Sequence, residues 1–68
     1  MDFRTLILQA LEDKYNAEIS EAEATLEIYL NKPVAIGEHP QHVEEANKLV
    51  EKIATAKEKL SILTGYKL

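Results

Sequence analysis

The stretch Asn31-Lys32-Pro33-Val34-Ala35-Ile36-Gly37-Glu38-His39 divides the chain into two parts that each have the residue pattern of a helix. Asn31 is a common residue at helix C-termini, and Pro33 disfavours the helical conformation at Lys32, so a helix that begins upstream must end here. Pro40 suits the first position of a following helix, because the missing N–H would have no intrahelical partner. The segment therefore predicts a connection between two helices.

The part before this connection contains neither glycine nor proline between Asp2 and Leu30. Its apolar side chains recur at steps of three and four residues, which is the spacing of one helix face. They are Leu8, Leu11, Tyr15, Ile19, Ala22, Leu26 and Tyr29. Asp2 is a favourable N-cap residue, so we expect a helix over about residues 2–30.

The part after the connection has the same spacing, at Val43, Ala46, Leu49, Val50, Ile53, Ala56, Leu60 and Leu63. His39, held extended by Pro40, is expected to be the N-cap residue, and Gly65 is expected to follow the last turn as the C′ residue. Glu44 and Lys48 are spaced to pair on the solvated face. We expect a helix over about residues 40–64. The chain thus predicts an all-α antiparallel helical hairpin, one domain over residues 1–68.

The small size of the chain predicts self-association. It has 68 residues and no cysteine, so neither a large core nor a disulfide can stabilise it. A second apolar line on the first helix lies about 200° from the first line. It consists of Phe3, Leu6, Ala10, Ala17, Ala24 and Ile28. Two opposite apolar faces indicate two neighbours, the second helix and a copy of the first helix, so we expect a homo-oligomeric helical bundle.

Three of these residues allow a second interpretation. Ala10, Ala17 and Ala24 are seven residues apart, which suits close helix approach along a coiled-coil seam. Alanine is also a good helix former on a solvated face. The large side chains of Phe3, Leu6 and Ile28 favour the seam, because they would otherwise be exposed.

Net charge excludes several classes of partner. The chain carries a net charge of −4, and its pI is about 5.0. We therefore expect no sequence-independent nucleic-acid binding and no binding to anionic membranes. No apolar run is long enough to span a bilayer, and the N-terminal residues lack the pattern of a signal peptide, so we expect a cytoplasmic protein.

The connection and the residues beside it carry the candidate ligand site. Free N–H groups at a helix N-terminus favour anions, and polar side chains beside them add donors. The candidate ligand-binding residues are Lys32, Gly37, Glu38, His39, Gln41, His42 and Tyr29. The residues alone favour a purely structural interpretation, in which His39 caps the helix, Gly37 serves a turn and Ile36 is a hydrophobic plug.

Metal binding and catalysis are weakly indicated. His39 and His42 with Glu38 or Glu45 would make a zinc set, but no second metal motif accompanies them. No hydroxyl nucleophile stands beside a histidine in the sequence. We therefore expect no metal, no cofactor and no enzymatic activity.

Charge is unevenly divided, and this suggests a second function. Residues 1–30 carry seven acidic and two basic side chains, and residues 31–68 carry five acidic and six basic ones. The first hypothesis is an oligomeric binding protein that holds a small anionic or nucleotide-like ligand. The alternative is a module that binds a host or phage protein through its acidic first helix, with Glu18, Glu21 and Glu27 as contacts.

The segment Leu30–Pro40, and above all Ile36-Gly37-Glu38-His39-Pro40, resembles a loop in small uncharacterised helical-hairpin proteins of tailed bacteriophages. In those proteins an Asn-Pro-x-Gly-Ile-Gly-Glu-His-Pro type loop joins two helices. This chain departs from the pattern by Lys32 before Pro33 and by Ala35 in place of glycine. The resemblance implies a phage or prophage origin and no established activity.

In size and architecture the chain is also similar to small all-helical phage proteins that assemble into oligomers and sequester cyclic-nucleotide immune signals. This similarity implies an anti-defence role, with phosphates held at helix N-termini between subunits.

Overall fold

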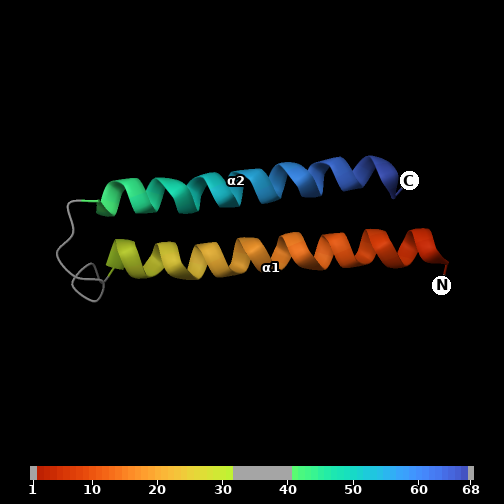
Figure 1. Ribbon diagram of the computed structural model, residues 1–68, viewed down its shortest axis with the longest axis horizontal. Coiled ribbons are helices and arrows are strands. Elements are labelled where there is room, and N and C mark those ends of the chain that lie inside the picture. Colours follow the sequence, from red (N-terminus) through yellow and green to blue (C-terminus); the bar gives the residue numbers. More distant parts are fainter. Residues whose placement is uncertain (1, 32–40, 68) are drawn as a thin grey trace.

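The computed structural model describes residues 2–31 and 41–67, and these form two helices, α1 (Phe3–Asn31) and α2 (His42–Tyr66). The helices run antiparallel and side by side over most of their length (Figure 1). No strand occurs within the described ranges. The predicted all-α hairpin is confirmed. The predicted roles of His39 and Pro40 fall on residues outside the described part.

The N-terminus of α1 has the predicted cap. The backbone N–H of Thr5 donates to Oδ1 of Asp2 at 2.7 Å, and the N–H of Leu6 donates to the Asp2 carbonyl at 3.1 Å. Hydrogen bonds from Thr5, through its side chain first and then its backbone, hold the pKa of Asp2 below its usual value, with a smaller contribution from Arg4. The carboxylate thus satisfies a donor that the helix itself leaves unpaired.

At the other end α1 extends to Asn31. The side-chain amide of Asn31 donates to the Glu27 carbonyl oxygen at 2.9 Å and to Oε2 of Glu27 at 2.6 Å. These bonds satisfy one of the carbonyls that the last turn leaves unpaired.

The predicted end of the second helix is wrong. Instead of stopping before Gly65, α2 continues through it to Tyr66, and the N–H of Lys67 donates to the Leu63 carbonyl at 3.1 Å. Two contacts with α1 hold this last turn in place: Arg4 donates to the Tyr66 carbonyl, and the Lys67 ammonium pairs with Glu12. The helical end is therefore stabilised by tertiary contacts that local sequence does not reveal.

The start of α2 also differs from the prediction. The helix begins at His42, two residues after Pro40, and Gln41 is its N-cap residue with no side-chain capping bond. Lys48 pairs with Glu45 at 3.3 Å rather than with Glu44 as predicted.

The core lies along the single seam between the helices. All seven residues of the predicted α1 stripe are buried or half-buried. On α2 the stripe is confirmed at Ala46, Leu49, Ile53, Ala56, Leu60 and Leu63. Val43 and Val50 are corrections: both are exposed, Val43 to 83%. Each follows a core-facing residue by one position, which turns it about 100° away from the seam.

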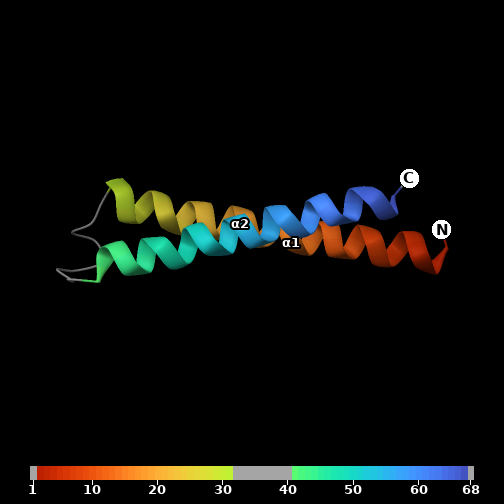
Figure 2. The same ribbon diagram turned by 90° about the horizontal axis from the view of Figure 1, so that it is seen from above.

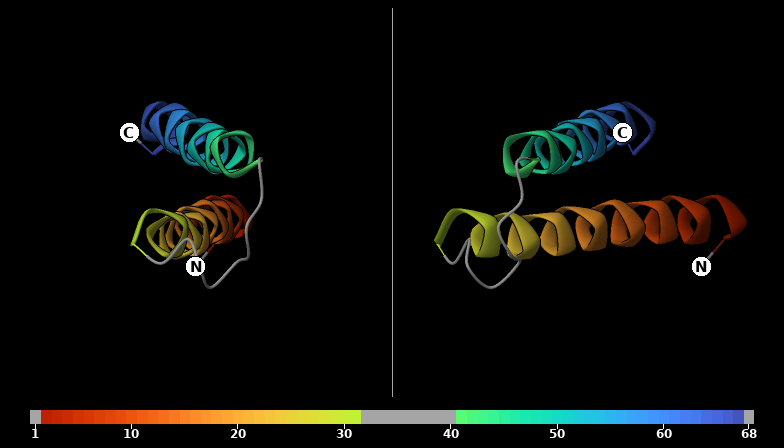
Figure 3. Two further views of the ribbon diagram at one scale, coloured as in Figure 1. Left: turned by 90° about the vertical axis from the view of Figure 1, so that its left-hand side faces the viewer. Right: turned by 60° about the vertical axis from the view of Figure 1, so that its left-hand side comes forward.

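Two small side chains are the most buried residues of the seam. Ala22 and Ala56 are each only 2% exposed, and the helices cross near the middle of the hairpin (Figure 2). The views nearer the long axis show two helices in a single layer, so each helix has one covered side (Figure 3). A single seam buries little: Ala22, Ala56 and Leu63 are the buried apolar residues of the described part, and Leu63 is still 7% exposed.

The shape of the hairpin leaves a large surface exposed. Its extents are 50 × 17 × 14 Å and its radius of gyration is 15.6 Å, whereas a compact chain of this length has a radius of about 11 Å. The exposed area is 5257 Å², against roughly 4,300 Å² for a compact monomer of the same mass. The hairpin is therefore more extended than a compact chain and exposes more surface for its mass.

Candidate assembly face and ligand-binding end

The second apolar line of α1 lies opposite the seam with α2, and we call it the outer face. It consists of Phe3, Leu6, Ala10, Ala17, Ala24 and Ile28, and all six are exposed. The larger side chains are far from covered, at 78% exposure for Phe3 and 46% for Ile28. Within one chain, α2 covers the seam side of α1 and leaves the outer face open.

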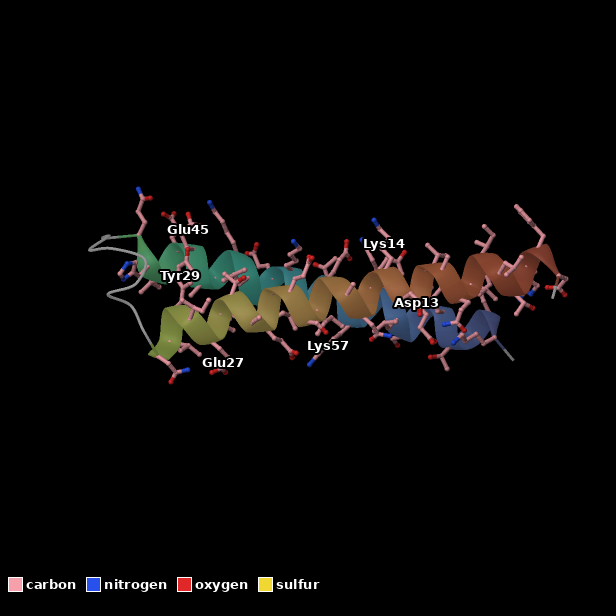
Figure 4. All side chains as sticks on the ribbon, turned by 90° about the horizontal axis from the view of Figure 1, so that it is seen from below. Asp13, Lys14, Glu27, Tyr29, Glu45 and Lys57 are labelled. Atoms are coloured by element: carbon pink, nitrogen blue, oxygen red, sulfur yellow. The ribbon has the colours of Figure 1, made fainter. Side chains whose placement is uncertain are left out.

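Charged side chains flank the outer face along the middle of α1. Figure 4 views α1 from this side, with Asp13 near its centre line and Lys14 and Glu27 on opposite edges. The Lys14 ammonium lies 3.9 Å from Glu18, one helical turn away. The middle of the outer face is therefore narrow and alanine-lined, with Asp13 and Lys14 beside it.

Further apolar side chains are exposed that the sequence patterns did not assign to any face. They are Ile7, Leu30, Ile62 and Tyr66. Ile7 borders the outer face, and the signal that reveals it is the seven-residue spacing Ile7, Lys14, Glu21, Ile28. This line runs beside the alanine line and widens the apolar surface at both of its ends.

At the loop end, the structure brings two of the candidate ligand-binding residues together. The rings of Tyr29 and His42 are 6.2 Å apart between centroids, with planes at 75°, which is an edge-to-face contact. Both residues are half-buried, and Gln41 beside them is exposed. The other four candidates, Lys32, Gly37, Glu38 and His39, lie outside the described residues.

This contact lies between the end of α1 and the start of α2. It places an imidazole and a phenol beside the first turn of α2, where backbone N–H groups carry positive partial charge. The same turn also carries two acidic side chains, Glu44 and Glu45. Residues 2–31 and 41–67 contain no group of three or more His, Asp or Glu side chains that could hold a metal ion.

At the opposite end, contacts that the sequence did not predict join the two termini of the hairpin. The pairing of Lys67 with Glu12, first as a hydrogen bond and then by charge attraction, holds the pKa of Glu12 below its usual value. A hollow of about 310 Å³ beside this pair is lined by Arg4, Thr5, Leu8, Gln9, Tyr66 and Lys67. Along the seam, the Lys59 ammonium lies 5.3 Å from the centre of the Tyr15 ring, a cation–π distance.

Comparison with known proteins returns no relative: no family model, no curated protein and no solved structure matches the chain. The resemblance to phage hairpin proteins therefore stays a prediction. Neither described helix is long and apolar enough to cross a membrane.

Proposed function

We propose that this chain is a small non-enzymatic binding protein that acts as a homo-oligomer. The observation that carries the proposal is the exposed outer face of α1, because it places Phe3, Leu6 and Ile28 in solvent on a chain with little core. A second copy that covers this face removes apolar area from water, and no longer chain is needed to do so. Sedimentation of the purified chain at micromolar concentration tests the assembly, and a folded monomer would contradict it.

The ligand belongs, in this proposal, at the loop end of the hairpin. The contact of Tyr29 with His42 supports this placement, because it puts a phenol and an imidazole side by side next to the first turn of α2. Lys32, Gly37, Glu38 and His39 adjoin these two residues in sequence. The Lys32 ammonium, the Gly37 backbone N–H and the His39 imidazole would supply further donors. The ligand class is a small anion, with a nucleotide phosphate as the leading candidate on the resemblance to phage signal-sequestering proteins.

Thermal unfolding in the presence of candidate anions tests the ligand part. We expect phosphate, sulfate or a cyclic nucleotide to raise the unfolding midpoint, because a ligand that binds only the folded state stabilises it by mass action. Lys32→Ala and His39→Ala should abolish this shift and leave the oligomer folded. Lys57→Ala removes an exposed lysine of α2 elsewhere on the chain and should keep the shift. If none of these anions moves the midpoint, the ligand proposal fails.

The alternative is a module that binds a protein through acidic α1. Glu21 and Glu27 are exposed, which supports it, whereas Glu18 is half-buried beside Lys14. Charge reversal at Glu21 and Glu27 should then release a stable protein partner, while changes at Lys32 and His39 should not. The opposite pattern of losses favours the anion-binding protein.

A further inference from the structure

We draw no further inference here: the strongest candidate, the exposed apolar outer face of α1, belongs to the assembly already proposed, and nothing in the structure shows what covers it.

Discussion

At the residue scale, the cap that Asp2 provides to α1 makes part of the stability dependent on pH. Its pKa is lowered in the fold, so its contribution is fully present above the unfolded value of 3.8 and is lost as the pH falls through the folded pKa. Asp2→Asn keeps a capping oxygen but does not titrate. We expect the wild type to lose more stability than Asp2→Asn between about pH 6 and pH 3.

Urea unfolding at several pH values measures this difference. Subtracting the Asp2→Asn profile removes the contributions of the other carboxylates, including Glu12, which titrate in both proteins. Parallel profiles for the two proteins would contradict the capping role. Asp2→Ala, which removes the capping oxygen, should lower the midpoint at neutral pH, where Asp2→Asn stays close to the wild type.

At the element scale, α2 continues as a helix through Gly65, whereas the sequence pattern places a C′ glycine there. The two conformations predict opposite effects of Gly65→Ala on the free energy of unfolding. A Cβ at this position would meet no atom within 4 Å, and alanine is the better residue in a helix. We expect Gly65→Ala to raise the free energy of unfolding by about 0.5–1 kcal/mol. Urea denaturation measures it, with Ala54→Gly as the reciprocal variant that should destabilise by about the same amount.

A destabilised Gly65→Ala variant would show that this residue adopts the left-handed conformation expected of a C′ glycine.

The helices themselves were predictable because the apolar spacing from Leu8 to Tyr29 is a local signal that one packing face must satisfy. The ends of the helices were harder to predict from the sequence, because the last turn of α2 contacts Arg4 and Glu12, which are more than fifty residues away in the chain. Val43 and Val50 were placed in the core for a related reason: a stripe drawn from apolar residues alone does not reveal the exact centre of the contact.

For the candidate site, the sequence predicted which residues lie near the connection, but it did not predict the contacts that they make. Tyr29 and His42 were named from their nearness to the connection, and their edge-to-face contact depends on how the two helices pack. The pairing of Lys67 with Glu12 had no local signal at all, because it joins residues from opposite ends of the chain.

At the scale of the whole molecule, one seam between two helices leaves a chain with a small core and a long apolar outer face. Marginal burial of this kind is relieved by association rather than by further folding. The central claim is therefore that the stable species is an oligomer built on the outer face of α1.

Sedimentation equilibrium of the wild type, Ala17→Lys and Ala54→Lys tests this claim most directly. Ala17→Lys places a lysine one turn from Asp13 and Glu21, so α1 itself is not weakened, but a charge enters the middle of the outer face. Ala54→Lys adds the same charge on the exposed side of α2. We predict an oligomer for the wild type and Ala54→Lys and dissociated chains for Ala17→Lys; a wild type that is a folded monomer at micromolar concentration would contradict the account.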